Sequence, residues 1–168
     1  GKPDLSTTVF GKKIDMPIFL SPTAMQRLYH HEGDKASARA AEKFGTFYSM
    51  STMANNTIEE IADISNGPKL FQLYVHKDQS ITDDLIDRCR VSGFNGMCLT
   101  VDTLVAGNRE RDHRTGFTTP PKLTLQSLMS FAMKPEWVFN YFTHKKFELS
   151  NVKNKTDKGT NISKSVIE

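Results

Sequence analysis

The sequence has little of several features that define specialised protein classes. Its 168 residues include only two cysteines, Cys89 and Cys98. Two cysteines are too few for a disulfide framework, and both lie in apolar patterns, so we expect two buried, reduced thiols. Long apolar runs are also missing, because no stretch approaches the ~20 consecutive apolar residues of a membrane-spanning helix. Residues 1–8 are polar and contain no apolar signal core. This pattern predicts a cytoplasmic protein.

Strong charge of one sign and metal-ligand spacing are missing as well. The formal net charge is only +3, and part of the excess lies in Lys145, Lys146, Lys153, Lys155 and Lys158. A basic run of this kind is usually a solvated surface, so we predict no nucleic-acid partner. The five histidines show no spacing typical of metal ligands. We therefore predict no metal site.

What the sequence does contain is typical of one globular α/β domain. It is 38% hydrophobic and 24% charged, which is ordinary for a domain large enough to bury a core. Short apolar runs alternate with amphipathic patterns between residues 16 and 103. We expect strands at 17–21, 46–50, 70–75 and 96–101. We expect helices at 34–44, from Thr57 with a Glu60 capping box, and from Ser80 with Asp83.

The spacing of glycines indicates repeated βα units. Gly45, Gly67 and Gly93 each end a helical pattern, and a strand follows closely. Such units build a parallel sheet, either doubly wound or a (β/α)8 barrel. A TIM barrel typically needs ~250 residues and eight strands. With about four strands, the chain is expected to form only part of one. A small hairpin over residues 7–15, turning at Gly11-Lys12, is expected to precede the first strand.

The pattern changes after residue 103. Residues 104–121 are polar and loop-like, and residues 123–142 are apolar and aromatic, broken by Pro135. Residues 151–159 are expected to be flexible, and 161–168 to begin a helix that is cut off. We therefore divide the chain into a hairpin with four βα strands (1–103), an active-site loop with the apolar segment (104–160) and a truncated helix (161–168).

Polar residues follow the strands on one face. Gln72 and Tyr74 share a face of the third strand, as do Thr100 and Asp102 on the fourth, and Ser51 ends the second. Ligands bind at the carboxyl ends of parallel strands. Buried polar groups need partners, and although a core hydrogen bond explains any one of them, the set predicts a polar ligand.

A nearby arginine is less informative by spacing alone. Arg109 is suited to bind a carboxylate, but its position next to Glu110 and close to Asp112 favours a salt bridge within the loop.

Five motifs in this order resemble the FMN-dependent 2-hydroxy-acid dehydrogenases, a family that includes glycolate oxidase, lactate oxidase, mandelate dehydrogenase and L-lactate dehydrogenases. The motifs are 22–25 (PTAM), 31–33 (HEG), 71–74 (FQLY), 99–103 (LTVDT) and 107–109 (GNR). Within the family, residues 48–54 (YSMSTMA), 108–112 (NRERD) and 118–123 (TTPPKL) are most similar to the cytochrome-linked L-lactate dehydrogenases.

The resemblance implies a TIM barrel with FMN at its C-terminal mouth. It implies that Tyr74 contacts the substrate oxygen, that Asp102 orients and stabilises a catalytic histidine, and that Arg109 binds substrate. Met53 stands where glycolate oxidases have tryptophan, which indicates a different substrate pocket. The residues implied to contact the flavin are Pro22, Thr23, Ala24, Ser51, Gln72 and Thr100.

The same resemblance implies that other catalytic groups lie elsewhere. The family's catalytic histidine, its flavin-contacting lysine and a second substrate arginine belong to later strands. We therefore expect this chain to be the N-terminal half of the barrel, inactive alone, in an enzyme that oxidises L-lactate to pyruvate and passes electrons to a cytochrome or quinone. The alternative is a non-catalytic flavin-binding or self-associating half-barrel, whose open strand edges would pair with another chain.

The aromatic segment leaves two interpretations open. Trp137, Phe139, Tyr141 and Phe142, followed by Lys145 and Lys146, are typical of a peripheral membrane-binding patch. Such a patch, within 123–146, would place the enzyme on the inner face of a membrane. The other interpretation is that the segment packs over the active site or against a neighbouring subunit. The resemblance also implies a homo-oligomer.

Overall fold

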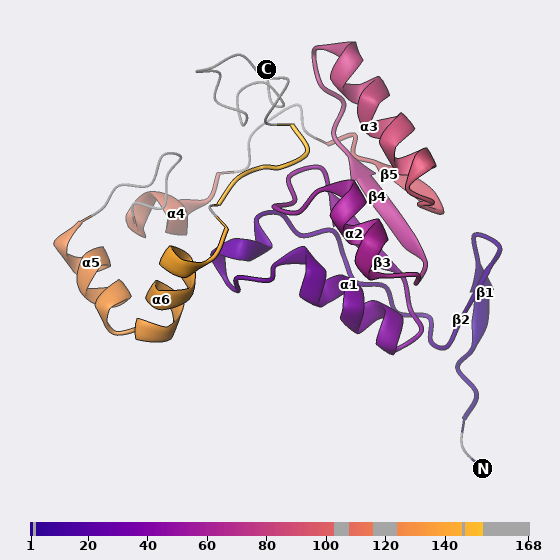
Figure 1. Ribbon diagram of the computed structural model, residues 1–168, viewed down its shortest axis with the longest axis horizontal. Helices are drawn as coiled ribbons and strands as arrows, with labels where there is room; N and C mark the ends of the chain where they lie inside the picture. The colour runs from indigo at the N-terminus through magenta and orange to yellow at the C-terminus, as the bar shows by residue number, and fades with distance from the viewer. Residues whose placement is uncertain (2, 103–107, 116–123, 146, 153–168) are drawn as a thin grey trace.

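The computed structural model describes residues 1, 3–102, 108–115, 124–145 and 147–152 (Figure 1). The helix predicted at 161–168 and most of the flexible segment predicted at 151–159 lie outside this part. Asn151 and Val152 are described, and both are buried. The prediction of flexibility was therefore wrong for these two residues.

A parallel three-stranded sheet lies at the centre of the fold. Its strands are ordered β3-β4-β5 and are joined through two helical crossovers. The strands are β3 (Tyr48–Ser51), β4 (Lys69–Leu73) and β5 (Gly96–Leu99), and the helices beside them are α1 (Asp34–Lys43), α2 (Ile58–Ile64) and α3 (Gln79–Val91). This order confirms the predicted βα units. The described residues form no closed barrel.

The first predicted strand, at 17–21, is wrong. It is reduced to one parallel bridge, in which the Leu20 N–H donates to the Phe47 carbonyl (3.0 Å) and the Leu20 carbonyl accepts from the Ser49 N–H (3.1 Å). The next rung would need an N–H at position 22, and Pro22 has none. The described sheet therefore has three strands instead of four.

The predicted hairpin is present but turns one residue earlier. Strand β1 (Thr7–Val9) pairs antiparallel with β2 (Lys12–Ile14), and Val9 lies opposite Lys12. The turn consists of Phe10 (φ 49°) and Gly11 (φ 71°). Two residues with positive φ match the twist of a two-residue hairpin.

Helix boundaries follow local capping. Thr57 and Glu60 form the predicted capping box at α2, with both backbone-to-side-chain distances at 3.1 Å. The third helix begins one residue before the predicted Ser80, because the Asp78 carboxylate accepts the Ser80 N–H (3.0 Å).

After β5, the described residues form the helices α4 (Glu110–Thr115), α5 (Leu125–Ala132) and α6 (Pro135–Thr143). The prediction of a loop over 104–121 is wrong at α4, where Glu110 stabilises the first turn and pairs with Arg114 (3.1 Å). The apolar segment is interrupted at Pro135, as predicted: α5 ends at Ala132, and Pro135 begins α6, where its missing N–H costs nothing. Among the described residues, no helix has both the length and the apolar character needed to cross a bilayer.

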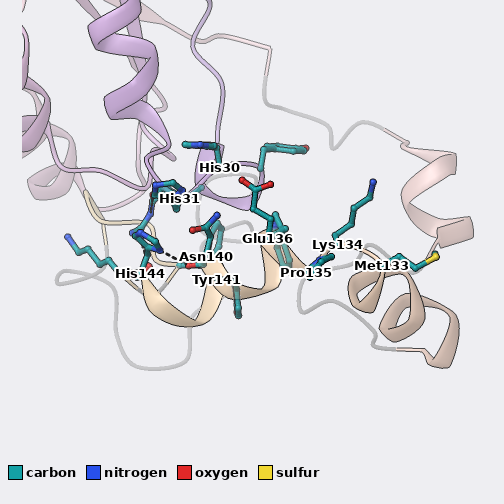
Figure 2. A pocket seen from close by; sticks show the side chains of 14 residues that line it. His30, His31, Met133, Lys134, Pro135, Glu136, Asn140, Tyr141 and His144 are labelled. Atoms are coloured by element: carbon teal, nitrogen blue, oxygen red, sulfur yellow. Dashed lines mark hydrogen bonds between the residues drawn. The ribbon is translucent and has the colours of Figure 1, made fainter.

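Helix α6 lies beside η1 (Gln26–Leu28), a short 3-10 helix (Figure 2). The Trp137 indole N–H donates to the Leu28 carbonyl (2.8 Å) and fixes the two elements together. Otherwise α5 and α6 stand apart from the sheet (Figure 1).

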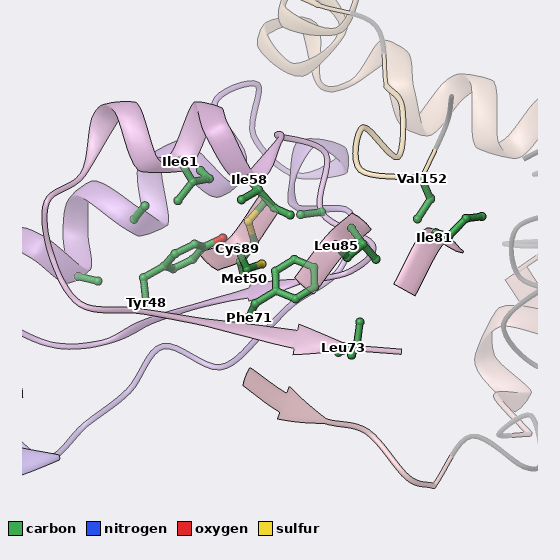
Figure 3. Packing of buried hydrophobic residues seen from close by; sticks show 13 residues of the cluster. Tyr48, Met50, Ile58, Ile61, Phe71, Leu73, Ile81, Leu85, Cys89 and Val152 are labelled. Atoms are coloured by element: carbon green, nitrogen blue, oxygen red, sulfur yellow. The ribbon is translucent and has the colours of Figure 1, made fainter. Parts of the chain in front are cut away.

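The two faces of the sheet have different roles. Tyr48, Met50, Phe71 and Leu73 alternate along β3 and β4 and point into the main core with α1, α2 and α3. Figure 3 shows this packing, in which Ile58, Ile61, Ile81 and Leu85 cover the strands. The helices thus bury one face, as strand alternation predicts. The opposite face carries Phe47 and Leu70, which pack on Ile14 of the hairpin.

The two cysteines are both free thiols, but only one is buried. Cys89 is buried, as predicted, and burial raises its pKa to about 12. Cys98 is exposed, so its predicted burial is wrong. It lies on β5, the edge strand of the described sheet, where Met97 and Leu99 are exposed too.

Candidate functional site

A chain of side-chain hydrogen bonds crosses all three strands at their carboxyl ends. The Ser51 hydroxyl donates to the Gln72 side-chain oxygen (3.1 Å), and the Gln72 amide nitrogen donates to the Thr100 hydroxyl oxygen (2.6 Å). Ser51 and Gln72 are register partners, and Thr100 directly follows β5. Strand alternation therefore placed these three predicted residues correctly on one polar edge.

Thr52 fixes this edge and was missed by the sequence reasoning. Its hydroxyl donates to the Gln72 carbonyl (2.6 Å) and accepts the Tyr74 N–H (3.1 Å). Its N–H also reaches the Gln72 side-chain oxygen (3.4 Å). The Gln72 amide is consequently held in one orientation. The available signal was a threonine directly after a strand, where a hydroxyl commonly bonds neighbouring backbone.

The segment 22–24 lies next to the same edge. The Met25 N–H donates to the Met53 carbonyl (3.2 Å), just beyond the end of β3. Met25 adopts a left-handed conformation (φ 56°), which is uncommon for a residue with a side chain. Pro22 and Thr23 are exposed and Ala24 is half-buried. Their backbone is therefore accessible at the carboxyl end of the sheet.

The three predicted catalytic residues lie less deeply. Tyr74 is half-buried beyond β4, whereas Asp102 and Arg109 are exposed. Asp102 is not part of the hydrogen-bond chain. From the sequence we expect it to be buried and therefore to need a polar partner, but its side chain is exposed. Arg109 makes no ion pair with Glu110 or Asp112 among the described residues; Glu110 pairs with Arg114 instead.

A buried carboxylate fixes the loop that leaves β3. Asp34 is fully buried at the start of α1, accepts the Tyr48 hydroxyl (2.9 Å) and accepts the Asn55 N–H (3.1 Å). Burial raises the pKa of Asp34, although these hydrogen bonds act in the opposite direction. Asn55 in turn accepts the Arg27 N–H (3.0 Å). Asp34 thus connects α1, β3 and η1, a role that its helix-start position did not reveal.

The polar edge fits a flavin chemically. The pyrimidine part of an isoalloxazine ring presents alternating N–H and carbonyl groups. The edge offers an oriented amide and two hydroxyls, and the Thr100 hydroxyl still has its own proton to donate, since its oxygen accepts from Gln72. The hydrogen-bond donors and acceptors of this edge therefore match those of the flavin ring.

Comparison with known proteins agrees with this chemistry. Residues 1–166 match the family model described as FMN-dependent dehydrogenase. The chain is similar to glycolate oxidase 1 of Zea mays (45% identity over 126 residues) and to L-lactate oxidase of a Nostoc species (41% over 133 residues). These matches cover 75% and 77% of this chain.

The same similarity extends to solved structures. The crystal structure of the monotopic membrane protein (S)-mandelate dehydrogenase superposes with a TM-score of 0.82 at 32% identity, covering 88% of this chain and 39% of that one. The matched region is also a limited part of the two relatives, 34% of the glycolate oxidase and 36% of the lactate oxidase. The chain thus spans about a third of the length of the curated relatives it matches.

Proposed function

The chain belongs to the FMN-dependent dehydrogenase family, and from this premise we propose that it supplies the N-terminal part of an active site that oxidises an L-2-hydroxy acid. The observation that carries the proposal is the Ser51–Gln72–Thr100 hydrogen-bond chain at the carboxyl ends of the strands. Ligands of parallel α/β folds bind at this position.

In this proposal each predicted residue has a distinct role. Gln72, Ser51 and Thr100 hold the flavin through hydrogen bonds, and the backbone of Pro22, Thr23 and Ala24 lies along it. FMN, when bound, accepts the two electrons that leave the substrate carbon.

Three further side chains act on the substrate or on the group that accepts its proton. The Tyr74 hydroxyl donates a hydrogen bond to a substrate oxygen, and Arg109 binds the substrate carboxylate. Asp102 is a positioning residue. It orients a proton-accepting histidine contributed from outside this chain and stabilises its protonated form.

We propose L-lactate as the substrate, pyruvate as the product and a cytochrome or quinone as the electron acceptor. Support comes from the resemblance of residues 48–54, 108–112 and 118–123 to cytochrome-linked L-lactate dehydrogenases, and from Met53. The similarity to an L-lactate oxidase is consistent with this substrate, while the similarity to glycolate oxidases makes glycolate the competing one.

An anaerobic flavin experiment tests the proposal. The gene product that carries this sequence, and the 168-residue chain alone, are loaded with FMN and freed of excess flavin. L-lactate, glycolate or (S)-mandelate is then added while flavin absorbance is followed. We expect the gene product to bleach most rapidly with L-lactate. Faster bleaching by glycolate would change the substrate, and no bleaching by any acid would contradict the proposed oxidation.

The chain alone tests whether its active site is incomplete. We expect it to lose FMN or to leave it oxidised, because it lacks the base that Asp102 would orient. Bleaching in the chain alone would contradict this view.

A matched pair of glutamine variants tests the flavin contacts. Gln72→Leu removes the buried amide, and we expect FMN retention to fall by about tenfold or more, since one or two hydrogen bonds are lost. Gln79→Leu changes an exposed glutamine at the start of α3, and retention should be unchanged. Equal retention in both variants would remove Gln72 from the flavin site.

A second candidate function is favoured by the open edge of the sheet. Met97, Cys98 and Leu99 are exposed on β5, as expected of a strand that pairs with another chain. A self-associating, non-catalytic half-barrel would form a stable oligomer through β5 and leave flavin oxidised. Light scattering separates the two, because a monomeric chain excludes self-association of this kind.

We also propose peripheral contact with a membrane through residues 123–146. The support is the exposure of apolar side chains on α5 and α6, including Leu125, Met129, Phe139 and Phe142, together with the structural similarity to a monotopic membrane protein. Deleting 123–146 from the gene product is expected to release it from membranes. Unchanged partitioning would contradict this contact.

A further inference from the structure

A cavity unrelated to the predicted flavin residues lies between helix α6 and the segment formed by η1 and the residues directly after it. Its volume is about 460 Å³, and none of the predicted site residues lines it. One wall comes from the segment Arg27–His31, and the other from residues 133–147 (Figure 2). Nothing in the proposed flavin chemistry uses this cavity.

Three histidine rings pack next to one another, two from the segment after η1 and one from the end of α6. The His31 ring lies 4.3 Å from the His30 ring and 4.2 Å from the His144 ring, centroid to centroid. The Nδ1 atom of His31 is buried and has no hydrogen-bond partner among the described residues. A buried polar atom without a partner is unfavourable. Because almost none of this atom is accessible, contacts with a ligand would come from the other polar side chains that line the cavity.

The charges around the cavity favour an anion. Arg27, Lys134 and Lys145 line it, whereas Glu136 is the one carboxylate among its lining residues. Some of this positive charge is already engaged, because Arg27 donates to the His31 carbonyl (3.1 Å) and Lys145 pairs with Glu60 (3.2 Å). The N-terminal end of α6, which also favours anions, borders the cavity at Pro135.

A metal ion does not fit the same side chains. The described residues contain no group of His, Cys, Asp or Glu that could hold a metal. A phosphate group offers several acceptor oxygens for protonated imidazole, ammonium and guanidinium donors. We therefore infer that this cavity is a binding site for a phosphate group.

Aromatic side chains beside the charged wall point to an amphiphilic source. Trp137 stacks with Phe131 (5.3 Å) and with Tyr141 (5.2 Å), and Trp137 and Tyr141 line the cavity. A lipid headgroup would place its phosphate against the charged side chains and its apolar part against the aromatic side chains. A free phosphate ester would contact only the charged side chains. The two sources share the same oxyanion chemistry and differ in their apolar part.

Binding at this cavity depends on pH. The His144 Nδ1–H donates to the Asn140 carbonyl (3.0 Å), so its other nitrogen becomes a donor only when the ring is protonated. Burial and the nearby His144 and His30 lower the pKa of His31. Arg27, Lys134 and Lys145 oppose protonation as well, while Glu32 and Glu136 favour it. A bound phosphate would offset the crowded positive charge and draw protons onto the rings.

The single tryptophan supplies a direct measurement. Trp137 is the one tryptophan of the sequence and lines the cavity, so its fluorescence reports on occupancy. The full chain is titrated with inorganic phosphate, and separately with vesicles of phosphatidylcholine alone or mixed with phosphatidylglycerol. We expect a saturable change that is about tenfold tighter near pH 5.5 than near pH 8.

Three variants locate the effect. Lys134→Gln and His144→Gln each remove a donor from the cavity and should weaken binding at least about fivefold, as expected when a charge-assisted hydrogen bond is lost. Lys77→Gln removes an exposed lysine that does not line the cavity, and binding should not change. Lys134→Gln is expected to disturb folding less than His144→Gln, because the Lys134 side chain makes none of the described side-chain hydrogen bonds of α6.

The phosphate and vesicle titrations distinguish the possible ligands. Saturation by inorganic phosphate without preference for phosphatidylglycerol assigns the site to a soluble phosphate, and saturation by phosphatidylglycerol vesicles alone assigns it to a lipid headgroup. The inference is overturned if neither probe saturates, if chloride at equal ionic strength gives the same change, or if Lys134→Gln and Lys77→Gln behave alike.

Discussion

Helices α1–α3 and helices α5–α6 differ in what their apolar side chains contact. Residues such as Ala38 and Ala41 of α1, and Ile81 of α3, are buried against the sheet. By contrast, Leu125 of α5 and Phe142 of α6 are 76% and 79% exposed. The more apolar sequences are thus the less buried ones in the described structure.

The difference teaches that apolar content does not by itself place a helix in a core. Each of helices α1–α3 leads after a short turn into a strand of the sheet and covers the same sheet face, so even small apolar residues are buried. Helices α5 and α6 contact the rest of the described fold mainly through Trp137 and the cavity wall. An exposed apolar surface of this kind is typical of a binding surface. The following four substitutions test this contrast.

The largest expected effect is in the core behind the sheet. Phe71→Ala removes a fully buried ring that packs against Phe94 (6.2 Å). We expect the free energy of unfolding to fall by about 3–5 kcal/mol, because the cavity cannot close between the strand and three helices. Urea unfolding followed by circular dichroism measures it. A loss below about 1 kcal/mol would mean that the sheet face is not tightly packed.

The next effect concerns the segment that returns from α6 to the core. The Asn151 side chain accepts the Ile58 N–H (3.1 Å) and donates to the Asn56 carbonyl (3.1 Å). Asn151→Ala leaves these buried backbone groups without partners, and we expect a loss of about 2 kcal/mol. The same unfolding experiment applies, with Asn66→Ala, an exposed position, as control. Equal stability of both variants would show that the returning segment is not docked.

A smaller, pH-dependent effect joins α2 to α3. Hydrogen bonds from Arg88 (2.6 and 2.7 Å) lower the pKa of Glu59 from 4.5 to about 2. A lowered pKa stabilises the fold above the unfolded value near 4.5, and this contribution disappears as pH falls toward 2. Because Glu59 is half exposed, solvent screening reduces the contribution to about 1 kcal/mol.

The variant Glu59→Gln isolates this contribution. It should be less stable than the parent near neutral pH and equally stable at the acid end of that window. A pH-independent difference between the two proteins would assign the effect to packing and not to charge.

The smallest effect on stability is expected on α6. Phe142→Ser changes an exposed ring, so the free energy of unfolding should stay within about 0.5 kcal/mol. Vesicle sedimentation of the same variant should nevertheless show weaker binding than the parent, since each buried phenylalanine contributes roughly 1.5–3 kcal/mol to apolar contact. A large loss of stability would instead mean that α6 packs in the folded protein.

Local sequence signals predicted much of the fold, because short-range rules govern them. The capping box at Thr57, the glycine that follows α1 and the alternation of Phe71 and Gln72 across β4 depend only on neighbours in sequence. The missing strand at 17–21 depends on a single absent donor at Pro22. The exposure of Cys98 depends on β5 being an edge, which an apolar run does not reveal.

The site was predicted in part for the same reason. Ser51, Gln72 and Thr100 could be placed on one edge from strand period alone, and hydrogen bonds join them. Asp34 and Asn151 could not be found, because their partners lie in other elements, 21 residues away in the case of Asn55 and 93 residues away in the case of Ile58. The flavin contacts of the Ser51–Gln72–Thr100 chain and of the segment 22–24 stay predictions. The roles of Tyr74, Asp102 and Arg109 stay predictions as well.

The docking of Asn151 has a consequence for the order in which the chain folds. Synthesis begins at the N-terminus, so α1–α3 and the sheet between them leave the ribosome before residues 147–152 do. Until then the Ile58 N–H, at the start of α2, lacks its acceptor. Residues 147–152 should therefore close onto a sheet that has already formed. Hydrogen exchange at the Ile58 amide would detect the reverse motion as local opening while the amides of β4 stay protected.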